Sequence, residues 1–90
     1  MTKFELKLIE KYPKKLGTAP TAKKIFDEIN DENEVILNFE NIEFMSRTFA
    51  QEYIFQRHNS KTKITEINMN ESIKQLLEVV QDDFKQTCLG

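Results

Sequence analysis

This chain of 90 residues is 39% hydrophobic and 31% charged, a balance typical of a folded globular domain and not of a disordered chain. Its net charge of −2 gives no general attraction to nucleic acid, and no apolar run approaches the roughly 18 residues that cross a bilayer. We therefore expect a single domain over residues 1–90, with no membrane span and no nucleic-acid partner. The single cysteine, Cys88, and a first segment without a hydrophobic signal core predict a cytoplasmic location.

The charge is distributed unevenly along the chain. Residues 1–24 hold seven lysines and two glutamates, a net charge of +5, whereas residues 25–90 hold six basic and thirteen acidic residues, a net charge of −7. The lysines form either a solvated basic segment or a site for an acidic partner. Nucleic acid is a weaker alternative, because no arginine-rich or aromatic-interleaved pattern accompanies them.

The first third of the chain predicts a strand, a loop and a helix. Apolar and charged residues alternate over residues 3–9, as in a strand with one wet face at the edge of a sheet, and this strand could run antiparallel to its neighbour. Pro13 and Gly17 mark a loop, and Pro20 suits the first turn of a helix. That helix has an apolar stripe at helical spacing: Ala22, Ile25, Phe26 and Ile29.

The rest of the chain predicts two further strands and two further helices. Residues 35–39 are apolar at four of five positions, which predicts a strand at the centre of the sheet, covered on both faces. Ser46 is the expected N-cap of the second helix. Residues 63–68 predict a short strand, and Asn68 or Asn70 caps the last helix. The apolar stripes of the two helices are Phe49, Ala50, Tyr53 and Ile54, then Ile73, Leu76, Leu77, Val80 and Phe84.

Strands and helices thus alternate along the chain. Alternation at these lengths predicts an α/β fold, in which right-handed crossovers place helices on a small, mainly parallel sheet. With the first strand free to run antiparallel, we expect a mixed sheet of about four strands carrying three helices.

The sequence contains no recognisable catalytic or metal-binding motif. Its two glycines, Gly17 and Gly90, cannot make a glycine-rich phosphate loop, and no Cys/His cluster has the spacing of a zinc site. The only histidine, His58, falls in a polar turn, and the paired acidic residues are predicted on exposed faces. We expect a protein that is not an enzyme, without catalytic, metal-binding or cofactor-binding residues.

The start of the second helix is the strongest candidate for a functional site. Ser46 and Thr48 lie where unpaired N–H groups and the helix dipole favour negative charge, and Arg47 between them could contact a phosphate or a carboxylate. The simpler interpretation is that Ser46 caps the helix and that the other two side chains are solvated.

The same stretch resembles a known family. Residues 35–54 resemble the centre of a STAS domain, the fold of bacterial anti-sigma factor antagonists, and more closely a small STAS-like family of unknown function. The matching segments are Asn38-Phe39, then Ser46-Arg-Thr-Phe-Ala-Gln-Glu52, then Ile67-Asn-Met-Asn-Glu-Ser-Ile73. The resemblance runs from about Thr18 to Val80.

The resemblance implies a non-enzymatic regulatory module that binds a partner, namely a kinase-like ATPase, and is switched by phosphorylation of a serine at the start of this helix. The family pattern there is Asp-Ser-Ser/Thr-Gly. Here Ser46 stands at the aspartate, Arg47 at the acceptor serine, Thr48 at the next hydroxyl and Phe49 at the glycine. Arginine cannot accept a phosphoryl group, so only Ser46 or Thr48 could replace the acceptor.

We therefore expect a protein partner to bind the turn at residues 41–45 and the start of the second helix. The predicted contact residues are Ser46, Arg47, Thr48, Gln51 and Glu52. The alternative is a small-ligand or anion sensor that holds a phosphate or nucleotide at the same helix start. Monomer and homodimer both remain open, because the long last helix has more apolar residues than so small a sheet can cover.

Overall fold

The described part of the chain, residues 3–89 of this computed structural model with side chains over 4–84, contains five strands and four helices. The elements in chain order are β1 (Lys3–Lys7), α1 (Leu8–Lys11), β2 (Lys15–Leu16), α2 (Ala19–Ile29), β3 (Glu34–Asn38), β4 (Phe44–Met45), α3 (Arg47–Asn59), β5 (Lys63–Ile67) and α4 (Glu71–Leu89). The alternation of strands and helices predicted this α/β architecture.

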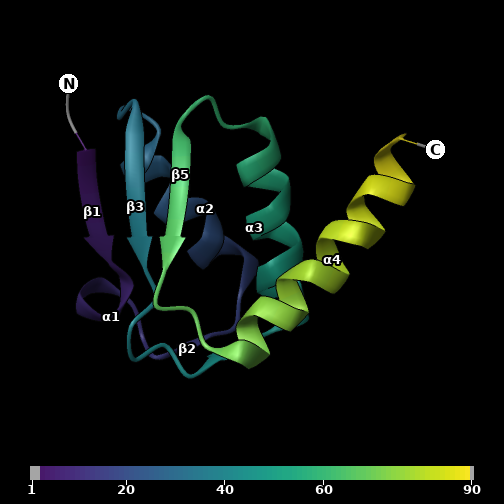
Figure 1. The fold of residues 1–90 in the computed structure, drawn as a ribbon, viewed down its shortest axis with the longest axis horizontal. Coiled ribbons are helices and arrows are strands. Elements are labelled where there is room, and N and C mark those ends of the chain that lie inside the picture. The colour runs from purple at the N-terminus through teal and green to yellow at the C-terminus, as the bar shows by residue number, and fades with distance from the viewer. Residues whose placement is uncertain (1–2, 90) are drawn as a thin grey trace.

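The main sheet has three parallel strands in the order β1-β3-β5, and β2 pairs with β4 in a separate parallel pair. Lys3–Lys7 lies opposite Glu34–Asn38, which lies opposite Lys63–Ile67. β1 is an edge strand, as its alternation predicted, but the antiparallel direction is wrong. The chain returns through α2 to the same end of the sheet before β3 begins, so the two strands run the same way (Figure 1).

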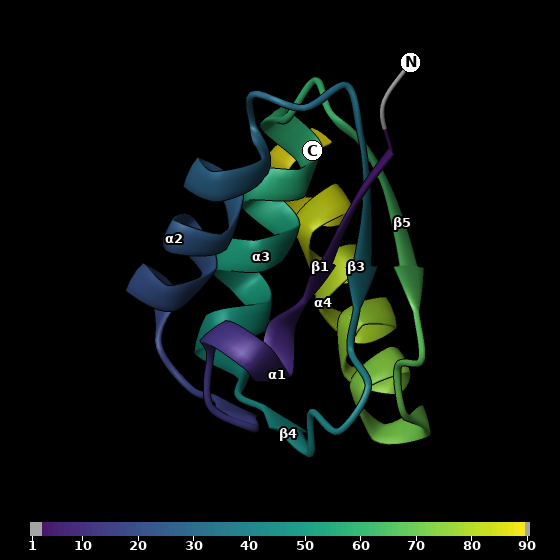
Figure 2. The ribbon, with the colours of Figure 1, turned by 90° about the vertical axis from the view of Figure 1, so that its left-hand side faces the viewer.

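The helices α2, α3 and α4 lie on one face of this sheet (Figure 2). β3 is the central strand, as predicted, but the prediction that both of its faces are covered is wrong. Val35 and Leu37 face the helices and are fully buried, whereas Ile36 on the opposite face is only partly buried. The residues paired with Ile36, Glu5 on β1 and Thr65 on β5, are polar, and such a face tolerates water.

Three short elements, α1, β2 and β4, were not predicted from the sequence. The first strand ends at Lys7, because the chain turns there into the single turn α1. The predicted loop at residues 11–17 contains β2, whose Leu16 is fully buried, and the predicted turn before the second helix contains β4. A two-residue strand has no measurable periodicity, so only tertiary pairing defines it.

The core lies between the main sheet and the helices. The predicted stripes of α2 and α3 are buried in full, and Tyr53 of α3 packs against the rings of Phe26, Phe39 and Phe49 at centroid distances of 5.5, 6.2 and 6.1 Å. The stripe of α4 is buried at Ile73, Leu77 and Val80 and only partly buried at Leu76 and Phe84. Beyond these contacts the second half of α4 extends past the rest of the molecule (Figure 1). Among the described residues, no helix combines the length and the hydropathy needed to cross a membrane.

Candidate functional site

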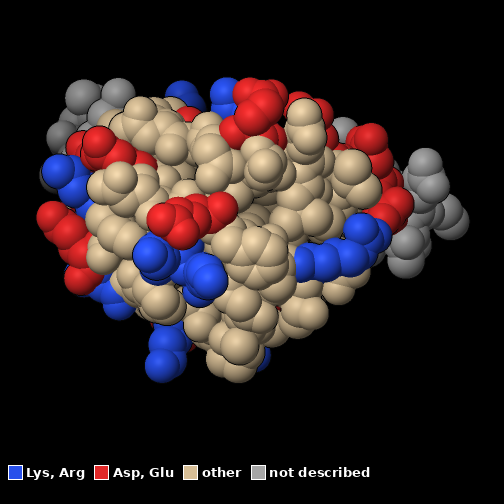
Figure 3. Space-filling view, turned by 90° about the horizontal axis from the view of Figure 1, so that it is seen from below, with Lys and Arg blue, Asp and Glu red and all other residues tan. Residues whose placement is uncertain are grey.

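The candidate site lies at the end of the molecule where the three parallel strands end. In Figure 1 this is the lower end, which carries β2, β4 and the starts of α3 and α4. Figure 3 views it directly and shows charged side chains separated by broad uncharged areas. Open α/β folds usually place binding sites at the carboxyl ends of their strands.

Ser46 is the N-cap of α3, as predicted. Its backbone is extended, and its Oγ accepts a hydrogen bond from the Phe49 N–H at 3.0 Å. The same hydroxyl donates to the Gly17 carbonyl at 2.9 Å, and the Ser46 N–H donates to the Leu16 carbonyl at 2.8 Å. The helix start is therefore held against β2, and the Ser46 side chain is half-buried with its hydroxyl already engaged.

The other predicted site residues follow on the solvent side of α3. Arg47, Thr48 and Gln51 are exposed, and the half-buried Glu52 accepts a hydrogen bond from Gln56 Nε2 at 2.7 Å. Arg47 is 53% exposed, and its guanidinium forms an ion pair with Asp83 of α4 at 2.6 Å. The structure thus brings the five predicted residues together at one helix start. It adds Asp83, which lies 36 positions after Arg47 in sequence.

Exposed apolar side chains lie just before this helix start on β4, further along α3, and on α4. Phe44 of β4 is 50% exposed, Phe55 of α3 is 50% exposed and Val79 of α4 is 51% exposed. β4 lies against α4, and α3 packs along α4, so the three residues belong to adjoining elements. Sequence analysis placed Phe44 in the predicted contact turn but did not assign Phe55 or Val79 to the site. The sequence did contain one indication that Phe55 and Val79 are exposed, because both fall outside the predicted apolar stripes of their helices.

The exposed Phe55 also belongs to a small aromatic cluster. Its ring lies 6.5 Å from that of Phe84, and the His58 ring lies 5.0 Å from Phe84 on the other helix. His58 is exposed and contacts this ring, so its role in the fold is packing at the surface. The cluster joins the outer parts of α3 and α4.

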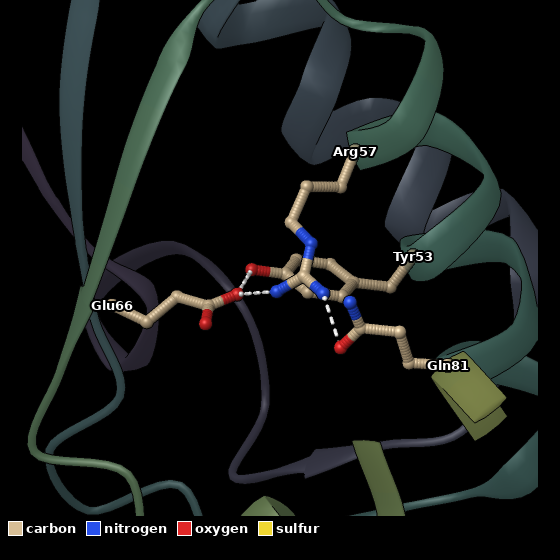
Figure 4. Close-up of polar contacts among 4 residues, drawn as sticks. All are labelled: Tyr53, Arg57, Glu66 and Gln81. Atoms are coloured by element: carbon tan, nitrogen blue, oxygen red, sulfur yellow. Dashed lines mark hydrogen bonds and ion pairs between the residues drawn. The ribbon is translucent and has the colours of Figure 1, made fainter. Parts of the chain in front are cut away.

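A partly buried polar cluster joins α3, β5 and α4 (Figure 4). The buried Tyr53 hydroxyl donates to Glu66 of β5, and the same carboxylate receives Arg57 Nη1 at 2.8 Å. Arg57 Nη2 donates to Gln81 Oε1 of α4 at 3.1 Å. Burial raises the pKa of Tyr53 well above its usual range, and the nearby Glu66 carboxylate adds to the effect. Each of these side chains has a hydrogen-bond partner within the cluster, so we interpret the cluster as a structural link between the three elements.

Asparagines organise the ends of β3 and β5. Asn38 is 5% exposed; its amide donates to Glu5 Oε2 at 2.9 Å, and its carbonyl accepts from the Glu40 N–H and from Asn68 Nδ2. Asn68 adopts a φ of 59°, a left-handed conformation that asparagine tolerates. Asn70, and not Asn68, caps α4 by accepting from the Ile73 N–H at 2.9 Å. These bonds set where α4 begins.

Part of the basic segment is neutralised within the chain. Lys11 Nζ lies 2.8 Å from Glu28, and Lys14 Nζ lies 3.7 Å from Glu43. The hydrogen bond from Lys11, followed by that from Tyr12, lowers the pKa of Glu28. Among the described residues no group of acidic, histidine or cysteine side chains has the arrangement of a metal site. The side chain of Cys88 lies outside the described part.

The fold and this surface define the class of the molecule, a small two-layer α/β domain with a fixed, exposed helix start beside a parallel sheet. Comparisons of the chain with protein-family models, with curated proteins and with solved structures give no match. The functional assignment therefore rests on the geometry of the site and on the sequence resemblance.

Proposed function

We propose that this protein is a non-enzymatic, cytoplasmic interaction module of the STAS-like kind, which captures a protein partner through β4 and the start of α3. The resemblance to anti-sigma factor antagonists makes a kinase-like ATPase the partner class to test first. The contact residues are those predicted from sequence, with Phe44 as the apolar anchor at the edge of the surface.

The observation that supports this proposal is the exposed apolar area at a rigidly held helix start. Phe44 exposes half of its surface on β4, directly before the helix, while the backbone around it donates hydrogen bonds to the carbonyls of Lys14 and Leu16. Aromatic side chains with polar surroundings are the usual anchors of protein–protein contacts. A surface that is already ordered loses little conformational entropy on binding.

The anion-sensor alternative has less support from the same geometry. The Ser46 hydroxyl already accepts the Phe49 N–H that a bound anion would use, and the Arg47 guanidinium faces Asp83. A phosphate at this helix start would have to displace a cap and approach a carboxylate. A protein surface requires neither change.

The test is quantitative capture of partners from the native host by matched variants. We expect Arg47→Glu to lose captured proteins that wild type retains, with an unchanged circular dichroism spectrum, because an exposed ion pair contributes only about 0–1 kcal/mol to stability. Lys61→Glu, an equal charge change at another exposed position, is the control and should capture normally. A kinase-like ATPase among the proteins lost would support the resemblance.

A charge-swapped variant separates direct contact from an indirect effect. In Arg47→Glu combined with Asp83→Arg, the ion pair between α3 and α4 is restored with its direction reversed. Capture should remain weak if Arg47 touches the partner. Recovery of capture in the swapped variant, or normal capture by Arg47→Glu alone, would show that the proposed surface is wrong.

A further inference from the structure

The exposed sides of α3 and α4 form one continuous surface, here called the α3–α4 face. Its apolar side chains are Phe55, Val79 and the half-buried Phe84. The rings of Phe55 and Phe84 lie against each other, and the Arg47–Asp83 ion pair also joins the two helices. Phe55 and Val79 each expose about half of their surface, although the buried stripes of their helices lie on the other side. Scattered apolar residues are ordinary on a protein surface, but aromatic and aliphatic groups gathered along two packed helices are typical of an interface.

Acidic groups lie close to these apolar side chains. Asp82 and Asp83 lie three and four positions from Val79, so helical geometry places them beside it, and both are exposed. Glu78 is also exposed, on the side of α4 that borders Arg57 and Glu66. On the described parts of the two helices, the exposed charged residues are four acidic groups and two basic groups: Glu71, Glu78, Asp82 and Asp83, with Arg47 and Lys74. Arg47 is already paired with Asp83, and Arg57 turns inward to Glu66. The rim is therefore acidic.

Apolar side chains within an acidic rim favour a binding partner that is both apolar and basic. This inference rests on the proposed function as an interaction module. We propose that the α3–α4 face binds a basic amphipathic helical segment of the partner. Leucine-type residues at i, i+3 or i+4, and i+7 of such a segment would cover Phe55, Phe84 and Val79. Its lysines and arginines would meet the exposed carboxylates of α4, Asp82 above all, which steer association and set the orientation.

A second copy of this chain does not fit the same face. A symmetric dimer places one surface against itself, so Asp82 of one copy would approach the acidic rim of the other. Like charges facing each other across an interface oppose association. The charge of the face thus favours a basic partner over self-pairing.

The test uses a labelled peptide of about 18 residues made of leucine and lysine in helical period, and a matched peptide of leucine and glutamate. We expect the wild-type protein to bind the leucine–lysine peptide in fluorescence anisotropy, more weakly as salt is added, and not to bind the leucine–glutamate peptide. Asp82→Lys and Phe55→Ser should each weaken binding by about tenfold or more. Asp31→Lys, the same charge change at an exposed position after α2, should leave binding within about twofold of wild type.

The opposite results overturn the inference. Equal losses in Asp82→Lys and Asp31→Lys would mean that the peptide responds only to net charge, and no binding at all would remove the basic segment as the occupant. Self-association in sedimentation that Phe55→Ser abolishes would assign the face to a second copy. Because Phe55 is half exposed, circular dichroism should show this variant folded.

The two proposals fail separately. If Arg47→Glu loses partner capture but the wild-type protein does not bind the leucine–lysine peptide, the proposed interaction module stands and only the basic helical segment is ruled out. Peptide binding that depends on Asp82 and Phe55, together with normal capture by Arg47→Glu, would keep the α3–α4 face and remove the docking site at the start of α3.

Discussion

Replacing Glu66 with alanine should be among the most destabilising polar substitutions in this protein. The Tyr53 side chain is fully buried, and the Glu66 carboxylate is the acceptor of its hydroxyl. Without that carboxylate the phenol keeps a buried, unpaired O–H, which costs about 1–3 kcal/mol. Arg57 also loses its ion pair, although it keeps Gln81 and some solvent, so we add no more than about 1 kcal/mol. The expected total is about 1–4 kcal/mol.

Tyr53→Phe should cost less, about 1–2 kcal/mol, because it removes the donor while Glu66 still pairs with Arg57. The double variant Tyr53→Phe with Glu66→Ala leaves no phenol unpaired. Its loss should therefore be smaller than the sum of the single losses, by about 1–2 kcal/mol.

Urea denaturation followed by circular dichroism measures all three variants against wild type. For a domain of this size each kcal/mol should also lower Tm by about 4–8 °C. Glu66→Gln is the matched control, because its amide oxygen can still accept from Tyr53 and should preserve most of the stability. Strictly additive losses, or a loss below about 0.5 kcal/mol in Glu66→Ala, would refute the claim that the cluster in Figure 4 holds the helices to β5.

Two further predictions concern the N-cap of α3 and the buried Tyr53. Ser46→Ala should destabilise the fold by about 1–2 kcal/mol in urea denaturation, because it removes both hydrogen bonds of the hydroxyl, whereas the exposed Thr48→Ala should stay within about 0.5 kcal/mol. Burial raises the pKa of Tyr53, so its contribution is present below about pH 10, where unfolded tyrosine ionises, and is lost as the pH rises above that value. Urea midpoints above about pH 10 should therefore fall less steeply in Tyr53→Phe than in wild type; parallel curves would contradict the assignment.

Local sequence carried much of the fold. The stripes of α2 and α3 are buried in full, because four apolar residues at helical spacing form one apolar face that packs against the core. β3 is the central strand, as its apolar run predicted, because runs of this kind are typical of strands away from the edge of a sheet. Ser46 is the N-cap because a serine before a helix can satisfy a backbone N–H.

The surface proposed for binding was only half visible in the sequence. The predicted residues of α3 do lie together at its start, since they are adjacent on one helix. The contribution of α4 came from the tertiary structure alone, because Arg47 meets Asp83 and Phe55 meets Phe84 across two packed helices. No local pattern links residues about thirty positions apart in sequence.

The sequence by itself determined the alternation of strands and helices, the faces that three helices bury and the residue that begins α3, because these follow from periodicity and from local backbone hydrogen bonds. Only the tertiary structure decided the direction of β1, the pairing of β2 with β4 and the inward turn of Glu66 toward Tyr53. Each of these depends on which distant segment lies alongside. A charged residue in a strand faces inward only when another element supplies its partners.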